Sequence, residues 1–232
     1  MSARLRGIAK ETEDVVRAGK YLVGGGREVV IGPAVEAALS GTRMYGPEAV
    51  AVTPDGDRAT AVEVTGESSL EAARRLTMAG KGAVAVLTFA SARNPGGGYL
   101  NGAQAQEEAL CRASALYATL RRAPEFYAHH RAERSPFYTD RVIHSPGVPV
   151  FRDDRGAFLA TPYQVGFLTS PAPNAGVIRR RTPEEAHRVP AALDARAERV
   201  LETAAERGYR RLVLGGYSQG EPRSRHGMIL KA

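Results

Sequence analysis

Two neighbouring carboxylates, Glu107 and Glu108, stand a short distance after a glycine-rich segment that begins at Asn94. Seven residues separate the triple glycine at 96–98 from the Gln-Glu-Glu sequence that contains them. Glycines let backbone N–H groups approach an anion closely, and the N-terminus of a following helix adds partial positive charge. A carboxyl group with a raised pKa can deliver a proton in general acid–base catalysis. The segment therefore predicts phosphate binding beside acid chemistry.

Each half of this segment also has a plain structural interpretation. The glycines lack the Gly-Lys-Ser/Thr ending of a P-loop and the spacing of a dinucleotide fingerprint. Acidic residues in a first helical turn are favoured by the helix dipole and need no further function. Consecutive helical residues project about 100° apart, however, so one of the two carboxylates can point into a crevice. A second triple glycine at 24–26 precedes a strand pattern without a carboxylate pair, and we expect a simple turn there.

The elements that would position the segment alternate between strand and helix. The apolar run 83–89 predicts a central strand covered on both faces, and the glycines follow it directly. The loop would then lie at the carboxyl end of a strand, the usual ligand crevice of open α/β sheets. Helices are expected over 3–19, 33–39, 70–79 with a serine N-cap, 103–120 and 184–207, and strands over 21–23, 28–31, 50–53, 60–65, 142–143, 148–151, 163–169 and 211–214. This alternation predicts an α/β layered domain.

Composition narrows the classes of protein and partner. The 232 residues are 43% hydrophobic, enough for one large domain with an N-terminal extension. The formal charge of +7 suits a phosphate-bearing partner, although only four of the 32 basic residues are lysines, so an arginine-rich genome would explain the charge equally well. The sequence has no apolar run of about 18 residues and no secretory signal pattern. We expect a soluble cytoplasmic protein that does not bind membranes.

Other residues that could do chemistry have weaker patterns. Cys111, the single cysteine, is expected to be a small buried side chain on a helix. The adjacent pair His129 and His130 favours a surface loop over a metal site, because no further ligand follows at a matching spacing. His144 stands beside a serine, but no Gly-x-Ser-x-Gly elbow is present. Tyr99, which directly follows the triple glycine, could line the predicted ligand crevice or pack under the glycine loop. No metal and no cofactor are expected.

The triple glycine at 96–98, the seven-residue spacer and the Gln-Glu-Glu at 106–108 resemble the signature of a known family, the microbial-type poly(ADP-ribose) glycohydrolases. That family is marked by a triple glycine, a short spacer and Gln-Glu-Glu. The resemblance extends over most of residues 3–216 and includes the flanking segments 89–94, 138–140, 149–153 and 168–175. It implies a macrodomain-like three-layer α/β fold with a central mixed sheet and an N-terminal helical extension. The implied division is an extension at 1–50, a catalytic core at 51–216 and a divergent tail at 217–232.

The resemblance also implies roles for particular side chains. Glu108 would be the catalytic acid, and Glu107 would hold hydroxyls of the ribose at the scissile bond, supported by Gln106. The glycine loop and Asn94 would grip the distal ribose and a phosphate. The remaining implied binding residues are Gly96, Gly97 and Gly98 in that loop, Glu67 and Ser68 at the adenine edge, and Gly215, Gly216, Tyr217, Ser218 and Gly220 in a second phosphate loop.

The implied activity is hydrolysis of ribose O-glycosidic bonds in poly(ADP-ribose) or in ADP-ribosylated proteins or nucleic acids, by a monomer that releases ADP-ribose without a cofactor. The chain departs from the family after Leu214, where Glu221 and Pro222 replace an apolar and an aromatic residue and Glu221 would repel a diphosphate. Relatives continue beyond the position of Ala232, so truncation, a reading-frame change or a divergent tail each fits, and the last elements of the fold would be missing or altered. A missing last strand would expose a sheet edge. Two alternatives therefore stay open: an ADP-ribose-binding module without turnover, and a non-functional product.

Overall fold

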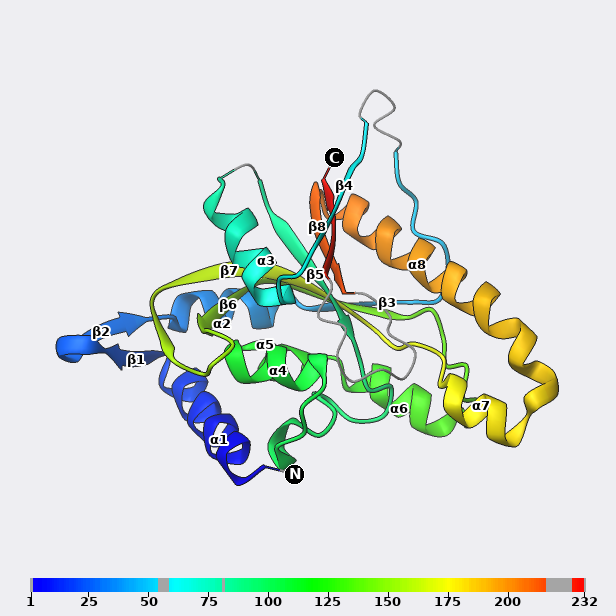
Figure 1. Ribbon diagram of the computed structural model, residues 1–232, viewed down its shortest axis with the longest axis horizontal. Coiled ribbons are helices and arrows are strands. Elements are labelled where there is room, and N and C mark those ends of the chain that lie inside the picture. Colours follow the sequence, from blue (N-terminus) through cyan, green and yellow to red (C-terminus); the bar gives the residue numbers. More distant parts are fainter. Residues whose placement is uncertain (1, 54–58, 81, 216–226, 232) are drawn as a thin grey trace.

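A seven-stranded mixed sheet forms the centre of the computed structural model, which describes residues 2–53, 59–80, 82–215 and 227–231 (Figure 1). The strand order is β3-β6-β7-β5-β8-β9-β4. The strands are β3 Arg43–Tyr45, β4 Ala61–Thr65, β5 Val84–Phe89, β6 Val142–Arg152, β7 Phe158–Ser170, β8 Arg211–Gly215 and β9 Gly227–Lys231. The mixed α/β class predicted from the sequence is confirmed.

The strand β5 is the predicted central strand, and its apolar residues fill both faces of the sheet. Val84 and Val86 belong to the larger core, whereas Ala85 belongs to a second core on the opposite side. The strand pairs in parallel with β7 on one side and with β8 on the other. Because parallel strands point the same way, the carboxyl ends at Phe89, Ser170 and Gly215 meet at one edge of the sheet.

Helices cover both faces of this sheet and give a three-layer arrangement. The larger core packs under α2 Gly32–Gly41, α3 Ser69–Met78, α4 Gln106–Ala113 and α5 Leu116–Leu120. The opposite face is covered by α8 Val189–Glu206, which buries Val200 and Ala204 against Leu168 and Leu212. Within the described residues, none of the helices has the length and apolar character needed to cross a bilayer.

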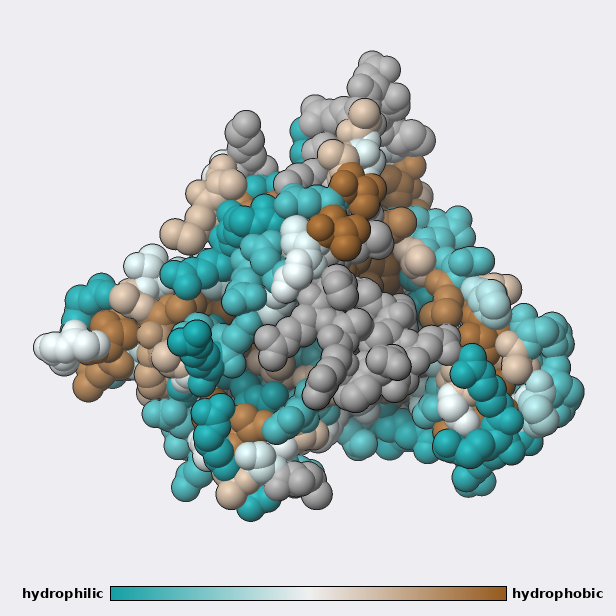
Figure 2. Space-filling view, viewed as in Figure 1, coloured by the Kyte–Doolittle hydropathy of each residue, from teal (hydrophilic) through white to brown (hydrophobic). Residues whose placement is uncertain are grey.

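The N-terminal helix α1 Ala3–Ala18 ends at Gly19 in the left-handed conformation, as its sequence predicts. It is tied to the core by Arg152, whose buried guanidinium donates to Glu11 at 2.6 Å and to the Thr12 hydroxyl at 3.2 Å. The hairpin of β1 Lys20–Val23 and β2 Arg27–Val30 follows, and its triple glycine forms the expected turn. This hairpin exposes Leu22 and Val30, while Val62 and Val64 are exposed on the edge strand β4; these surfaces contribute apolar patches in Figure 2.

Several predicted elements have different boundaries in the structure. The single helix expected over 103–120 is two helices, because Ser114 adopts an extended conformation and bridges to Val150 of β6. The strands expected at 142–143 and 148–151 form one continuous β6, with a register shift against β7 between Ser145 and Val148. The helix expected from 184 begins at Val189, after a 3₁₀ turn at Pro183–Arg188, and residues 50–53 form no strand.

Among the α-helices and strands of the described residues, the sequence patterns missed β3, β9, α6 Pro124–Ala132 and α7 Ala175–Arg181. The backbone of β9 lies between β8 and β4 and pairs antiparallel with both. The edge of β8 is therefore covered in this chain. The strand β3 pairs with β6, so the segment before residue 50 contributes to the central sheet.

Candidate active site

The triple-glycine loop after β5 lies directly against the two carboxylates at the start of α4. Gly96 and Gly97 have φ angles of 66° and 57°, a region that favours glycine. A methyl group added at Gly97 would lie 2.6 Å from Glu108 Oε1 and 3.1 Å from Glu107 Oε2. The sequence therefore needs glycine here for two reasons, the backbone conformation and the close approach to the carboxylates.

Both carboxylates are buried, and each uses one oxygen to hold the loop. Glu107 and Glu108 are 3% and 7% exposed. Glu107 Oε2 accepts a hydrogen bond from the Ser91 N–H at 2.7 Å, and Glu108 Oε1 accepts one from the Gly98 N–H at 2.9 Å. The other two oxygens, Glu107 Oε1 and Glu108 Oε2, are buried without a hydrogen-bond partner among the described residues. Buried carboxylate oxygens without partners are costly for folding, and such atoms are typical of sites that bind a ligand.

Burial raises the pKa of Glu107 to about 8, because the ionised form loses its hydration. The backbone N–H of Ser91 opposes this rise, the neighbouring charge of Glu108 adds to it, and the N–H of Gly96 opposes it. Burial is the largest of these causes. A carboxyl group with this pKa is mostly protonated at neutral pH, so the pair carries a proton there.

Gln106 joins the carboxylate pair to two neighbouring elements. Its Oε1 accepts from the Phe89 N–H at 2.9 Å, and its Nε2 donates to the Leu87 carbonyl at 3.1 Å and the Ser69 hydroxyl at 3.2 Å. All of its polar atoms are thus used within the protein. Gln106 fixes the start of α4 against the carboxyl end of β5 and the first turn of α3.

Hydrogen bonds within the loop fix its shape. The Gly97 N–H donates to the Asn94 carbonyl at 3.0 Å, and the Ser91 hydroxyl accepts from the Asn94 N–H at 3.2 Å. The N–H groups of Gly97 and Gly98 both donate to oxygens of the protein itself rather than to a ligand. Phosphate binding by this loop therefore stays a prediction.

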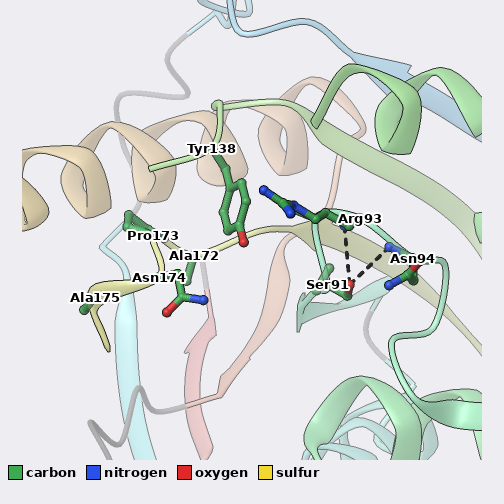
Figure 3. A pocket seen from close by; sticks show the side chains of 10 residues that line it. Ser91, Arg93, Asn94, Tyr138, Ala172, Pro173, Asn174 and Ala175 are labelled. Atoms are coloured by element: carbon green, nitrogen blue, oxygen red, sulfur yellow. Dashed lines mark hydrogen bonds between the residues drawn. The ribbon is translucent and has the colours of Figure 1, made fainter. Parts of the chain in front are cut away.

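A cleft of about 480 Å³ opens beside the Ser91 end of this loop (Figure 3). Its walls come from the segment after β5, the segment after β7 and Tyr138. The lining residues are Ala90, Ser91, Ala92, Arg93, Asn94, Tyr138, Ala172, Pro173, Asn174 and Ala175. Of these, the sequence analysis gave a role only to Asn94. All ten lie in the segments 89–94, 138–140 and 168–175 that carry the family resemblance, but the resemblance gave no role to Arg93, Tyr138 or Asn174.

The comparisons with known proteins agree with this geometry. The family model described as microbial-type PARG, catalytic domain, matches residues 9–153. The chain belongs to this family. A crystal structure of poly(ADP-ribose) glycohydrolase (PARG) from Thermomonospora curvata is 50% identical, with a TM-score of 0.86 over 94% of this chain and 81% of that chain.

Two further PARG structures are similar to this chain and carry ligands. The T. curvata enzyme bound to the inhibitor ADP-HPD is 48% identical, with a TM-score of 0.82 over 94% of this chain and 81% of that chain. The Deinococcus radiodurans enzyme in complex with ADP-ribose is 43% identical, with a TM-score of 0.71 over 81% of this chain and 78% of that chain. A comparison with curated proteins finds no match.

The predicted adenine-edge residues of this microbial-type PARG lie at the start of α3. Ser68 is the N-cap of that helix, and its hydroxyl accepts from the Glu71 N–H at 3.1 Å. The Glu67 carboxylate accepts from Arg75 at 2.7 Å and 2.8 Å. Both side chains are therefore used in building α3, whose first turn contacts Gln106 through Ser69.

Only the first residue of the predicted second phosphate loop is described. A methyl group added at Gly215 would lie 2.9 Å from Gln106 Nε2, so the carboxyl end of β8 reaches the site. The other residues predicted for that loop, Gly216, Tyr217, Ser218 and Gly220, lie outside the described residues.

The weaker candidates of the sequence analysis have structural positions. Cys111 is fully buried on α4, as predicted. Tyr99 is also fully buried and packs under the loop, where its hydroxyl donates to the Ala9 carbonyl at 3.1 Å. The expectation of a surface loop for His129 and His130 is wrong, because both lie on α6 and His130 is fully buried.

His144 is part of the sheet rather than of a catalytic pair. It is buried in β6, where its Nε2 lies 2.9 Å from the Tyr209 hydroxyl, and burial lowers the pKa of its imidazole to about 4. Across the described residues, no group of three or more His, Cys, Asp or Glu side chains could hold a metal ion.

Proposed function

We propose that this chain is a poly(ADP-ribose) glycohydrolase that hydrolyses ribose O-glycosidic bonds and releases ADP-ribose, with Glu108 as the general acid and base. The observation that carries the proposal is the buried pair of carboxylates, each with one oxygen bound to the loop and one without a partner among the described residues. Membership of the microbial-type PARG family supports the same reaction.

The proposed reaction begins with a proton transfer from Glu108 Oε2 to the oxygen that leaves the scissile bond. The bond between the ribose C1″ and that oxygen breaks, and an oxocarbenium-like centre develops at C1″. The Glu108 carboxylate then takes a proton from water, whose oxygen forms the new bond to C1″. The products are ADP-ribose and the free hydroxyl of the remaining molecule, and Glu108 is protonated again.

Glu107 is proposed to bind the ribose hydroxyls through Oε1. Hydroxyl groups that donate to a carboxylate stabilise its ionised form. In the free protein burial raises the pKa of Glu107 to about 8, so Glu107 is mostly protonated at neutral pH. Substrate hydroxyls bound to Glu107 would favour its ionisation, which leaves the proton for Glu108. Binding and acid catalysis are thereby coupled within one pair of side chains.

The remaining binding roles are part of the same proposal. Asn94 and the triple glycine would contact the distal ribose and a phosphate, and Gln106 would position the pair. Contacts to the adenine edge are proposed for Glu67 and Ser68, and contacts to the diphosphate for Gly215, Gly216, Tyr217, Ser218 and Gly220. The proposal includes a cytoplasmic monomer that acts on polymer attached to protein or nucleic acid. The monomer is divided into an extension at 1–50 that supplies β3 to the central sheet, a core at 51–216 and a tail at 217–232 that supplies β9.

Two measurements on the purified chain test this function. ADP-ribose at about 100 times its Kd would stabilise a folded binding domain by about 2.7 kcal/mol, which raises the Tm of a chain of this size by about 5–10 °C. Labelled poly(ADP-ribose) should release ADP-ribose. Stabilisation without release would contradict the proposal and identify a binding module, and the absence of both effects would contradict it as well.

A further inference from the structure

The cleft of Figure 3 lies on one side of the carboxylate pair, and Gly215 at the end of β8 lies on the other side. The relevant strand order is β7-β5-β8, with all three carboxyl ends at the same edge of the sheet. The carboxylates lie beside the loop after β5, and Gly215 ends β8. A substrate whose diphosphate is bound beyond β8 and whose scissile bond is at β5 would therefore continue towards β7, where the cleft opens.

The side chains of this cleft suit a nucleotide. Arg93 is exposed, and its guanidinium has no ion pair or hydrogen bond with the described residues. Figure 3 shows that guanidinium extending towards the ring of Tyr138. Asn94 and Asn174 add two amides, and the described lining residues include no carboxylate. An aromatic ring can stack with a base, a guanidinium can bind phosphate, and amides can pair with base edges.

The cleft is also large enough for a small molecule, and its residue Tyr138 has an unusual backbone conformation. Its volume of about 480 Å³ falls within the range typical of small-molecule sites. Tyr138 has a φ of 58° and is the one non-glycine residue with a positive φ in the described part of the chain. A bulky residue in this conformation is strained, and such residues cluster at ligand sites.

A buried histidine supports the strained turn. The ring of His130 meets that of Tyr138 edge-on, with centroids 5.8 Å apart. Its Nδ1 lies 2.9 Å from the Phe126 carbonyl, so Nδ1 carries the proton, and its Nε2 accepts from the Thr139 hydroxyl at 2.8 Å. Burial lowers the pKa of His130 to about 4, which keeps the ring neutral and this arrangement intact at neutral pH.

A buried arginine joins the two walls of the cleft. Arg196 of α8 donates to the Asp140 carboxylate at 2.7 Å and to the Phe137 carbonyl at 3.2 Å on the Tyr138 side, and to the Pro171 carbonyl on the other side. The Asn174 N–H also donates to the Pro136 carbonyl at 2.8 Å. The walls are therefore held at a fixed distance before any ligand arrives, which lowers the entropic cost of binding.

We propose that this cleft is a leaving-group subsite, in which Tyr138 stacks on the adenine and Arg93 binds a phosphate of the polymer unit that departs when the scissile bond breaks. The inference rests on the proposed glycohydrolase function and extends it from the released ADP-ribose to the next unit of the chain. Tyr138 and Arg93 are binding and positioning residues here, and they take no part in the proton transfers.

The test compares two substrates that differ only beyond the scissile bond. One is a short ADP-ribose oligomer, and the other is ADP-ribose with a methyl group on its 1″ oxygen, which cannot reach the cleft. Tyr138→Gly removes the ring and also relieves the positive φ, so the variant should fold. Tyr138→Phe keeps the ring. Arg93→Ala is matched by Arg155→Ala, an exposed arginine in the turn between β6 and β7, at the far end of β7 from the cleft.

Tyr138→Gly should lower kcat/KM for the oligomer about tenfold, the effect of losing one base–aromatic stack, and leave the methyl substrate within about twofold of the wild type. Tyr138→Phe should resemble the wild type on both substrates. Arg93→Ala should lower oligomer turnover and weaken its dependence on salt, whereas Arg155→Ala should do neither.

Equal losses on both substrates, or no loss on the oligomer, would overturn the subsite while leaving the glycohydrolase function intact. A wild-type protein that binds ADP-ribose but cleaves neither substrate would instead refute the proposed function, and the inference would fall with it.

Discussion

Replacing Glu107 with glutamine removes a buried ionisable group and should remove a large pH dependence of folding. The pKa of Glu107 is raised from 4.5 to about 8, mainly by burial. Between these values the folded chain binds more protons than the unfolded chain. The contribution of Glu107 to the free energy of unfolding must therefore fall as the pH rises, with its stabilisation complete below pH 4.5 and lost as the pH passes through about 8.

The size of this effect follows from the width of the interval. Each pH unit between the two pKa values contributes about 1.4 kcal/mol, so the full interval corresponds to about 5 kcal/mol and the range from pH 5 to pH 8 to about 4 kcal/mol. For a chain of this length, about 4 kcal/mol corresponds to a change in Tm of about 10 °C. Glutamine keeps an oxygen that can accept from the Ser91 N–H, so the loop contact survives the substitution.

Chemical denaturation of the wild type and Glu107→Gln from pH 5 to pH 9 measures the effect. The folded-state pKa values of His130 and His144 are lowered to about 4, so both histidines destabilise the fold as the pH falls below about 6.5. They do so in both proteins, and the difference between the two profiles isolates Glu107. Glu125→Gln, in the exposed first turn of α6, serves as the control and should follow the wild type. Parallel profiles for the wild type and Glu107→Gln would refute the burial argument.

Three further substitutions test the glycine loop, the Gln106 bridge and the cleft, and Gly25→Ala in the β1–β2 hairpin is the control for the first of them. Gly97→Ala and Gly25→Ala each place alanine at a positive φ and should cost about 1 kcal/mol of stability. An added methyl group meets a carboxylate only at position 97, so Gly97→Ala alone should lose about tenfold or more in kcat. Equal kcat values for the two variants would show that the close contact between the glycine loop and the carboxylates does not matter for turnover. Gln106→Leu removes the side-chain oxygen that accepts from the Phe89 N–H and should cost about 1–3 kcal/mol in denaturant titrations, together with a fall in kcat. Unchanged stability would show that this bridge is not needed. Arg196→Met removes the ion-pair partner of Asp140 and should lower the free energy of unfolding by about 3 kcal/mol. Turnover of the oligomer should fall more than turnover of the methyl substrate. An equal loss on both substrates would show that Arg196 does not act through the cleft.

The parts of the fold that the sequence predicted well have local physical causes. The strand β5 is apolar on both faces because helices cover both faces, and this composition is visible without a structure. The start of α3 at the Ser68 cap depends on side chains three residues apart. The carboxylate pair and the triple glycine are close in sequence as well as in space, so their contact was also open to prediction.

The errors have causes that act over long distances in the sequence. Ser114 interrupts the helix expected over 103–120 because it bridges to Val150 in another element. His130 is buried by the packing of α6, and adjacent histidines give no local sign of this. The segments that line the cleft were noted in the sequence, but their assembly into one cleft was not, because Arg196 joins its two walls from a third element.

Single-turnover cleavage of labelled poly(ADP-ribose) by Glu108→Gln, with ADP-ribose binding measured by calorimetry on the same sample, tests the central claim most directly. The amide has nearly the shape of the carboxyl group but cannot donate or accept the catalytic proton. We predict a loss of ADP-ribose release of about 100-fold or more, the usual size of general acid–base catalysis, with ADP-ribose affinity within a few-fold of the wild type. Release at the wild-type rate would contradict the assignment of Glu108 as the acid and base.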